Sequence, residues 1–486
     1  MIRFIHARNR LVARILALSA AAGLLGSAAS RGAESRAFVA ATDFGTGSLA
    51  NIAFGPPRTV TPNAASTSPD AVLRWFGGLL YVVNRSGASN IQVLDPANNF
   101  ALVHQTSVGS GANPHDIQPV SATKAYVTRY DTADLWIINP QTGQFLGSIS
   151  LAAFADADGI PEMDHLALRN GRLFVSIERL DRNNFYAPAG GSQVVVIDVA
   201  TNAIVDVDPG TPGVQGILLP YQDPITEMVV DPNGQIVVGC VGNFGVFDGG
   251  IVRIDPVSLT VAATEITEAA LAGDINDVAV LNAERGFAVV ADASFNTALR
   301  AYRRDLGTVQ STLISSSGYF LADCEVNDRT ELWVCDRDFS NPGVRVFDAV
   351  TYVELTPTRL NTGPPPQDIA FDGSSTVDVP IRSSESGGVS MTIAAISPNP
   401  SPGAVEILFS LGESAAGSGA STVSARIVDV AGRTIRTMSV PATGAGRHSL
   451  VWDGMRADGC PAETGVYFVE LRSGGMAARG RLVRIR

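Results

Sequence analysis

The residues best suited to chemistry recur at one position of a repeated pattern, the start of a short apolar strand. Most copies carry a carboxylate there, and two carry an imidazole. These residues are Asp70, His115-Asp116, Asp164-His165, Glu227, Asn276-Asp277, Asp323 and Asp368. Oxygen ligands with two imidazoles can hold a divalent cation, with calcium or magnesium favoured. A bound cation could then polarise a carbonyl group or activate water.

We therefore predict one binding site from these residues, with no catalytic residue assigned. Its members are His115, Asp116, Asp164, His165, Glu227, Asp277, Asp323 and Asp368, and the possible metal ligands are Asp116, His165, Glu227 and Asp277. The competing interpretation is structural. Arg85, Arg129, Arg179 and Arg337 recur at the ends of second strands and could pair with the acids from module to module. A feature of every repeat usually serves the fold, and a register shift of one residue would exchange His115 and Asp116.

The strands that must position these residues are clearest in Gly111–Leu151. This stretch predicts four strands, Asp116–Val120, Ala125–Thr128, Leu135–Asn139 and Phe145–Leu151. Each strand is too short and one-sided to be stable alone, so copies of the module must pack face to face.

The second strand of the module recurs seven times, mostly at the spacing of propeller blades. The copies are Phe38–Ala41, Tyr81–Asn84, Tyr126–Arg129, Phe174–Ile177, Val237–Cys240, Phe287–Ala291 and Leu332–Cys335. The first strand also recurs seven times, but its last copy, Pro366–Gly373, has no second strand after it. We therefore expect Asp368–Phe371 to pair with Phe38–Ala41 and close the ring. The sequence predicts an all-β fold with a seven-bladed β-propeller over residues 37–373.

The third strand of five modules ends in an aspartate or asparagine that begins a turn. These residues are Asp95, Asn139, Asp198, Asp255 and Asp348. Such side chains bond backbone N–H groups two residues further on, so we interpret them as turn formers and exclude them from the site.

Three stretches resemble the YVTN-type propellers of the lactonase-like superfamily. They are Gly111-Ala112-Asn113-Pro114, Tyr81–Asp95 and Thr362-Gly363-Pro364-Pro365. The resemblance covers roughly Ala37–Gly373 and implies the propeller fold. Propellers of this type serve as binding proteins, surface-layer proteins and lactonase-like enzymes, so the resemblance implies no single activity.

The long insertions all fall in the loops on the face where the first strands begin. They are Phe154–Met163, Leu180–Ser192, Asp206–Asp223 and Val241–Gly249, and they carry Phe154, Phe185, Tyr186, Tyr221, Phe244 and Phe247. Loops on a rigid scaffold are where binding usually occurs. The alternative is that these aromatic side chains hold the long loops against the core.

The first 29 residues have the order of a secretory signal peptide. Arg3, Arg8, Arg10 and Arg14 precede an apolar run, Ile15–Leu25, and small residues follow up to Ala29. The run is too short for a membrane span, and no other long apolar stretch occurs, so no transmembrane helix is expected. We expect a secreted or outer cell-surface protein that passes through the periplasm.

The charge excludes two classes of partner. The formal net charge is −12. The signal carries four arginines, residues 396–486 carry ten arginines and seven acids, and the linker before them sums to −1, so the central region is near −18. A surface of this sign disfavours nucleic acid and anionic membranes.

Of the four cysteines, Cys324 and Cys335 flank a turn at Asn327–Thr330 almost symmetrically. We expect them to face each other across a hairpin, where an oxidising compartment would allow a disulfide. Two buried thiols are the alternative.

The tail contains a second domain. Residues 374–395 read as a Ser/Gly-rich linker, and 396–486 contain alternating strands that suggest a small Ig-like β-sandwich. Pro398-Asn399-Pro400, Val428–Arg433, Gly446–Gly454 and Thr464–Phe468 resemble the Ig-like domain of flagellar hook-capping proteins and the related type A C-terminal sorting domain of type IX secretion. The resemblance implies that this domain directs secretion and cell-surface attachment. The alternative is an accessory β-sandwich without a sorting role.

No zinc-protease, phosphate-loop, dinucleotide or nucleophile-elbow motif occurs in the sequence. We predict a protein that binds a protein, glycan or small-molecule ligand through its loop-rich face. One alternative is a metal-assisted, lactonase-like hydrolase at the centre of the ring. A structural surface-layer component is a third hypothesis.

Overall fold

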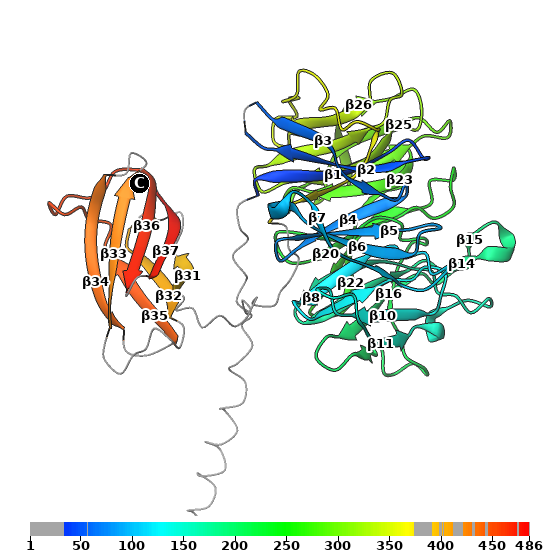
Figure 1. Ribbon diagram of the computed structural model, residues 1–486, viewed down its shortest axis with the longest axis horizontal. Coiled ribbons are helices and arrows are strands. Elements are labelled where there is room, and N and C mark those ends of the chain that lie inside the picture. The colour runs from blue at the N-terminus through cyan, green and yellow to red at the C-terminus, as the bar shows by residue number, and fades with distance from the viewer. Residues whose placement is uncertain are drawn as a thin grey trace, which may run out of the picture. The chain divides into compact units, whose positions relative to one another are not determined.

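The computed structural model describes residues 34–55, 57–373, 391–397, 401, 403–411, 421–429, 433–442, 446–473 and 476–485. The predicted signal peptide and residues 374–390 of the predicted linker lie outside these ranges. The chain divides into two compact units, Met1–Ile381 and Arg382–Arg486, and the regular secondary structure described in both is almost entirely β-strand (Figure 1). No helix within the described ranges is long and apolar enough to cross a membrane.

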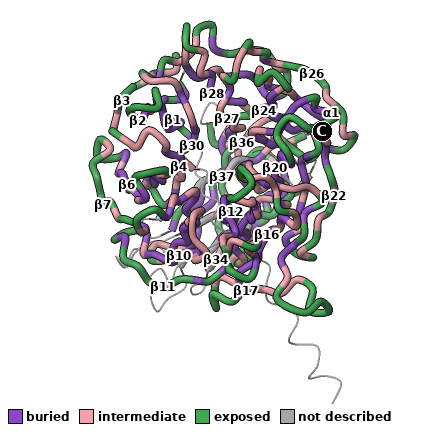
Figure 2. Tube along the Cα trace, turned by 90° about the vertical axis from the view of Figure 1, so that its right-hand side faces the viewer, coloured by how far each residue is buried: buried purple, intermediate pink, exposed green. Residues whose placement is uncertain are grey.

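The first unit is a β-propeller of seven antiparallel sheets around one axis (Figure 2). From the innermost strand outward, the first three sheets are β30 (Pro366–Phe371), β1 (Arg36–Thr42), β2 (Gly47–Ala53), β3 (Thr59–Thr67); β4 (Ala71–Phe76), β5 (Leu79–Asn84), β6 (Asn90–Asp95), β7 (Ala101–Ser107); and β8 (Ile117–Ser121), β9 (Lys124–Val127), β10 (Asp134–Ile138), β11 (Phe145–Ser150). The remaining four are β12 (Met163–Arg169), β13 (Arg172–Ile177), β16 (Gln193–Asp198), β17 (Ala203–Val205) with β18 (Ile217–Leu218); β19 (Val229–Val230), β20 (Ile236–Cys240), β21 (Gly250–Asp255), β22 (Thr260–Thr267); β23 (Asp274–Val280), β24 (Arg285–Ala291), β25 (Thr297–Arg303), β26 (Thr308–Ser315); and β27 (Leu321–Val326), β28 (Glu331–Asp336), β29 (Gly343–Asp348).

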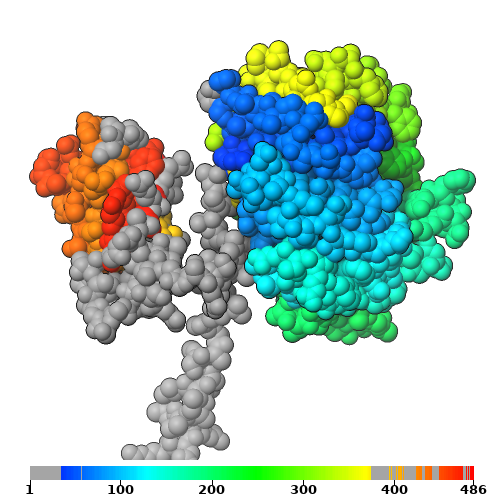
Figure 3. All heavy atoms as spheres, in the orientation of Figure 1, coloured from blue at the N-terminus to red at the C-terminus, as the bar shows by residue number. Residues whose placement is uncertain are grey.

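Short elements lie in the connections between these strands. They are the 3-10 turns η1 (Pro96–Asn98), η2 (Ala152–Phe154) and η3 (Arg182–Asn184), the helix α1 (Glu268–Leu271), and a small hairpin of β14 (Leu180–Asp181) and β15 (Ala187–Pro188). In Figure 3 this hairpin projects beyond the loops around it.

The ring closes as predicted. β30 pairs antiparallel with β1, with Ala370 opposite Phe38 and Ile369 opposite Val39. Each innermost strand contacts the next around the ring, in the order β4, β8, β12, β19, β23, β27, β30 and back to β4. Closure removes the two exposed inner edges that an open row of sheets would leave.

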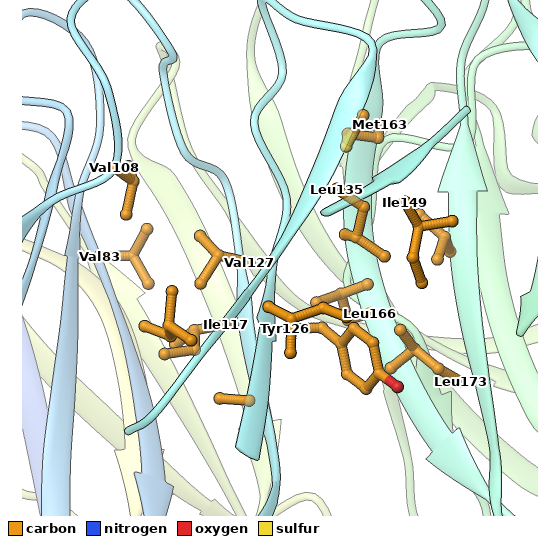
Figure 4. Close-up of a cluster of buried hydrophobic side chains, with 14 of the residues drawn as sticks. Val83, Val108, Ile117, Tyr126, Val127, Leu135, Ile149, Met163, Leu166 and Leu173 are labelled. Atoms are coloured by element: carbon orange, nitrogen blue, oxygen red, sulfur yellow. The ribbon is translucent and has the colours of Figure 1, made fainter. Parts of the chain in front are cut away.

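Neighbouring blades pack face to face through apolar side chains (Figure 4). Val83 of β5, Val127 of β9 and Leu173 of β13 are fully buried members of one cluster that spans three blades. The predicted turn formers also act locally. The side chain of Asp95 accepts the N–H of Ala97, and that of Asn139 accepts the N–H of Gln141, both at 2.9 Å.

The blade of β27, β28 and β29 differs from the expected four strands. Its outer position is taken by an irregular segment in which Glu354 and Leu360 form isolated bridges to β29. Pro357 lies between them, and proline has no N–H to give to a regular strand ladder.

The predicted pairing of Cys324 and Cys335 is not formed. Both thiols are free and buried. The register between β27 and β28 shifts after Leu321, which places Cys324 opposite Val334 instead of Cys335. Adjacent residues of a strand face opposite sides, so the two thiols lie in different core clusters, Cys324 with Phe287 and Cys335 with Phe371.

The second unit is an Ig-like sandwich of two antiparallel sheets. One contains β31 (Met391–Ser397), β32 (Val405–Leu411) and β35 (Gly446–Trp452), and the other β34 (Thr434–Ala442), β33 (Ser421–Asp429), β36 (Gly465–Ser473) and β37 (Met476–Arg484). Its core contains the buried rings of Phe409, Trp452 and Tyr467. β31 begins within the predicted linker, since Ile393 and Ile396 pack against this core.

Candidate functional site at the ring centre

The predicted site residues lie at the starts of the innermost strands. His115-Asp116 and Glu227 precede β8 and β19, Asp164-His165 lie in β12, and Asp277, Asp323 and Asp368 lie in β23, β27 and β30. All are buried except His115 and Glu227, which are partly exposed. Because successive innermost strands are neighbours, these residues lie close together around the centre of the ring. We call the propeller face where these strands begin the top face.

Three of the aspartates join one blade to the next. The N–H of Leu73 donates to Asp368 Oδ2 at 2.8 Å, that of Leu166 to Asp116 Oδ2 at 2.8 Å, and that of Cys324 to Asp277 Oδ2 at 2.7 Å. In each pair the aspartate and the donor come from adjacent innermost strands. We call these contacts interblade clasps. They satisfy buried backbone donors, so these carboxylates have a structural role.

The arginines that were expected to pair from blade to blade do not do so. Arg85 pairs with Asp70 of its own blade at 2.6 Å. Arg129 donates to the carbonyl of Val108, and Arg337 bonds Gln367. Arg129 and Arg337 do reach the neighbouring blade, but they bond a carbonyl and an amide oxygen there and not one of the strand-start acids.

The cation at the ring centre is Arg74, which the sequence analysis missed. Its Nε lies 2.7 Å from Asp116 Oδ1, and its Nη1 lies 2.5 Å from Glu227 Oε1. Arg74 thus joins β4 to acids of two other blades, one of them not adjacent. The sequence contained a signal for this role. Arg74 occupies a position of the innermost strand where three other copies of the repeat carry an alanine, namely Ala167, Ala279 and Ala370.

His115 and Asp164 form a short hydrogen bond. His115 Nδ1 lies 2.6 Å from Asp164 Oδ1, and the His115 ring stacks on Tyr130 with centroids 4.1 Å apart. The stack and the hydrogen bond together fix the orientation of the imidazole.

His165 lies between two aspartates. Its Nε2 is 3.3 Å from Asp164 Oδ2, and its Nδ1 is 3.8 Å from Asp116 Oδ2. Burial disfavours the charged ring, but the two carboxylates outweigh burial and raise the pKa of His165 to about 9. Burial likewise opposes ionisation of Asp164, yet the neighbouring imidazoles lower its pKa to about 2. His165 is therefore an imidazolium at neutral pH.

Tyr130, Glu178 and Asp223 extend this cluster and were not predicted. Tyr130 donates its hydroxyl to Glu178 Oε2 at 2.5 Å. Burial, with the charges of Asp164 and Asp223, raises the pKa of Glu178 well above its usual value. Burial and the charge of Asp164 raise the pKa of Asp223 to about 7. The sequence contained one signal for this extension of the cluster. Glu178 is an acid at a position where other copies of the repeat carry the neutral residues Asn84 and Thr128.

Carboxyl groups outnumber cations on the other side of the ring centre. Burial and neighbouring acids raise the pKa of Asp277 and Asp323, and they raise that of Asp368 to about 7. The buried Oδ2 of Asp323 has no hydrogen-bond partner in the described structure. This half of the site therefore holds carboxyl groups in excess of basic side chains, and burial favours their protonated form.

The proposed metal ligands are engaged with protein groups. Asp116 and Glu227 bond Arg74, and Asp277 accepts the N–H of Cys324. Among the described residues, no three His, Cys, Asp or Glu side chains are placed to hold one metal ion. Metal binding by Asp116, His165, Glu227 and Asp277 remains a prediction.

The long loops lie beside the same strand starts. The N–H of Leu180 donates to Glu162 Oε2 at 3.0 Å, and that of Gly245 to Asp274 Oδ2 at 2.7 Å. Of the loop aromatics, Phe154 is buried and holds its loop to the core. Phe185, Tyr186 and Phe244 are exposed, which places apolar rings on the top face.

The family profile described as the FlgD Ig-like domain matches residues 411–475. This match agrees with the Ig-like fold of the second unit. No curated protein matches the sequence.

Solved structures resemble the propeller at low sequence identity. A protein from Lactobacillus plantarum is 12% identical, with a TM-score of 0.51, over 70% of this chain and 99% of that chain. Virginiamycin B lyase from Staphylococcus aureus is 11% identical, with a TM-score of 0.45, over 62% and 88% of the two chains. Dihydro-heme d1 dehydrogenase NirN is 15% identical, with a TM-score of 0.46, over 72% and 79%. At such identity the likeness concerns the fold alone.

Proposed function

We propose that this chain is an exported propeller, secreted or held at the outer cell surface, that binds a protein, glycan or small molecule through its top face. The single observation that carries the proposal is the exposure of Phe185, Tyr186 and Phe244 on long loops of a closed, rigid ring. Exposed aromatic side chains on a rigid scaffold are typical of binding surfaces.

Binding can be tested on arrays of defined glycans and peptides. The matched variants are Phe185→Ala/Tyr186→Ala/Phe244→Ala on the top face and Val257→Ala/Leu306→Ala in exposed turns between third and fourth strands, at the opposite ends of the blades. We expect the arrays to identify a ligand that binds to the wild type and to the turn variant but not to the top-face variant. Equal loss in both variants, or no ligand at all, would contradict the proposal.

We further propose that residues 1–29 direct export and that the second unit acts as a type A sorting domain. The basis is the charged, apolar and small-residue order of the N-terminus together with the motifs of the tail. A reporter carrying a signal peptide and residues 374–486 should reach the surface of a bacterium with type IX secretion. It should remain in the periplasm of a matched strain without that machinery. Identical localisation in both strains would exclude this role.

The second candidate function is a metal-assisted, lactonase-like hydrolase at the ring centre. The observation that favours it is the Asp164–His115 pair, in which the carboxylate orients an imidazole beside the acids of the ring centre. A divalent cation, if bound, would polarise a substrate carbonyl. The test is hydrolysis of lactones and esters by the purified protein. Loss of this activity on chelation and in the variants His115→Ala and His165→Ala, with melting temperatures near that of the wild type, would favour this function over binding alone.

A further inference from the structure

Five blades carry an exposed phenylalanine in the loop between the second and third strands. Each follows an aspartate, asparagine or serine, and we call the five residues the phenylalanine array. They are Phe44 (71% exposed), Phe185 (97%), Phe244 (53%), Phe295 (61%) and Phe339 (79%). Single exposed apolar residues are normal, but the same residue type at the same place in five blades is a repeated feature of one face.

The fold does not require these rings. Phe44, Phe185 and Phe295 have φ angles of 66°, 56° and 61°, a left-handed conformation that bulky residues rarely adopt. Glycine or asparagine would fill such positions with less strain. Their side chains also bury little apolar surface, so neither backbone geometry nor core packing explains a phenylalanine there. Contact with another molecule explains a phenylalanine at these positions.

All five loops lie on the top face. The N–H of Thr42, at the start of the Phe44 loop, donates to the carbonyl of Pro365 at 2.8 Å, directly before β30. The loop of Phe244 contacts Asp274 at the start of β23. Phe339 packs edge-on against Phe320, which precedes β27, with centroids 5.7 Å apart. The array therefore surrounds the ring centre and its surplus of carboxyl groups.

Each loop of the array is folded around an aspartate that accepts a backbone N–H. The bonds are Gly45 N–H to Asp43 at 2.9 Å, Asn183 N–H to Asp181 at 2.9 Å, Asn243 N–H to Asp248 at 2.8 Å, Ser294 N–H to Asp292 at 2.8 Å and Ser340 N–H to Asp338 at 3.0 Å. Hydrogen bonds of this kind lower the pKa of Asp43, Asp292 and Asp338, so these carboxylates remain charged near the rings.

Basic residues are scarce in these loops. Residues 43–46, 242–249 and 292–296 contain no lysine or arginine. The other two loops contain Arg179, Arg182 and Arg337. Arg182 is paired with Asp131 and Glu162, and Asp338 is paired with Arg359 at 3.4 Å. Rings beside carboxylates such as Asp43 and Asp292 favour a cation that can lie on an aromatic face. The structure already contains one such contact, since the guanidinium of Arg337 lies 4.3 Å from the ring centroid of Phe44.

We propose that the phenylalanine array docks an arginine-rich segment of a partner protein, with guanidinium groups on the rings and the segment held over the acidic ring centre. This inference rests on the proposed function, because it names the partner class of the top face. Arginine is favoured over lysine since its planar group stacks on aromatic rings. The positive charge of such a segment complements the formal net charge, near −18, of the central region that contains the propeller.

The test uses the whole mature chain and fluorescein-labelled nona-arginine, with fluorescence anisotropy as the readout. The variant Phe44→Ala/Phe295→Ala/Phe339→Ala should bind at least about tenfold more weakly at unchanged net charge, because three cation–π contacts are lost. The matched control Val257→Ala/Leu306→Ala should bind like the wild type. Nona-lysine should bind the wild type more weakly than nona-arginine does. Thermal melting checks that each variant is folded.

Three outcomes separate this inference from the proposed function. Equal nona-arginine binding by the wild type and the triple variant would overturn the array as the docking surface. A wild type that ignores nona-arginine but binds a neutral glycan or phosphatidylcholine vesicles, with loss in the triple variant, would overturn the partner class and leave top-face binding standing. If no probe distinguishes the triple variant from the control, the array fails as a docking surface. Top-face binding fails as well if the variant Phe185→Ala/Tyr186→Ala/Phe244→Ala also binds every probe like the control.

Discussion

At the scale of single residues, Arg74 is the most consequential side chain at the ring centre. It neutralises Asp116, which is 1% exposed, and Glu227 of a non-adjacent blade. Removing one member of such a group leaves the remaining charges desolvated and unpaired. The contact also ties together blades that are far apart in the sequence.

We predict that Arg74→Met lowers the free energy of unfolding by about 3 kcal/mol, near the lower end of the range for a broken buried pair because Glu227 is partly exposed. Arg85→Met is the matched control. Its partner Asp70 is more exposed, so its loss should cost about 0–1 kcal/mol. Urea unfolding measures both, and equal effects would show that Arg74 is not the central ion-pair partner.

The residues of the ring centre also predict how stability depends on pH. The folded-state pKa of Asp368 is raised to about 7, so the native state binds a proton that the unfolded state releases near pH 4. The pKa of His165 is raised to about 9 against 6.5 unfolded, so its contribution is complete below pH 6.5 and is lost through pH 9. Asp164, lowered to about 2, stabilises above pH 4 and loses that contribution towards pH 2.

We therefore expect stability to be greatest near pH 4 to 5 and to fall steadily towards pH 9, since the folded state binds more protons over this range. Melting temperatures at constant ionic strength measure the profile. Asp368→Asn keeps an acceptor for the N–H of Leu73 and removes one titrating group, so its profile should be flatter between pH 4 and 7. An optimum at pH 8 in the wild type would contradict these assignments.

At the scale of elements, the interblade clasps join strands that share no ladder of hydrogen bonds. The carboxylate of Asp277 accepts the N–H of Cys324 in the next innermost strand. Asp116 and Asp368 repeat this contact in other blades. The repeated aspartates of the sequence are thus explained largely as connections between blades.

We predict that Asp277→Ala destabilises the propeller by about 1–3 kcal/mol, because it leaves the N–H of Cys324 buried without an acceptor. Asp277→Asn retains an acceptor oxygen and removes a carboxyl whose pKa is raised by burial, so it should be close to neutral. Chemical unfolding at pH 7 separates the two. A similar loss in both variants would show that charge, not the hydrogen bond, matters at this position.

At the scale of the whole molecule, β30 makes one ring out of seven sheets. It pairs with β1, and its Asp368 clasps β4. Without β30, the blade of β1 to β3 would lose its innermost strand and β27 its neighbour. Closure of the ring therefore depends on the six residues of β30, near the C-terminal end of the propeller.

We predict that a chain of residues 30–373 unfolds in one cooperative transition, whereas residues 30–361, which lack β30, aggregate or unfold without cooperativity. The reason is the exposed edge of β1 and the open ring. Calorimetry and size-exclusion chromatography distinguish the two chains. Equal cooperativity and a monomeric state in both would show that closure by β30 is not needed for folding.

The sequence by itself determined the strands, the count of blades, the closing pair and the turn formers. These follow from alternating apolar residues, repeat spacing and side chains that bond their own backbone, all of which are local or periodic features. The repeated polar residues near the starts of the innermost strands were also visible in the sequence, and their role as a binding site stays a prediction.

Only the tertiary structure decided which of those polar residues meet and in what protonation state. Arg74 lies far in sequence from Glu227, and the register shift that separates Cys324 from Cys335 depends on pairing between strands. The phenylalanine array became visible only when the exposure of each loop was known. Such features depend on distances and desolvation between distant segments, and no local pattern encodes these quantities.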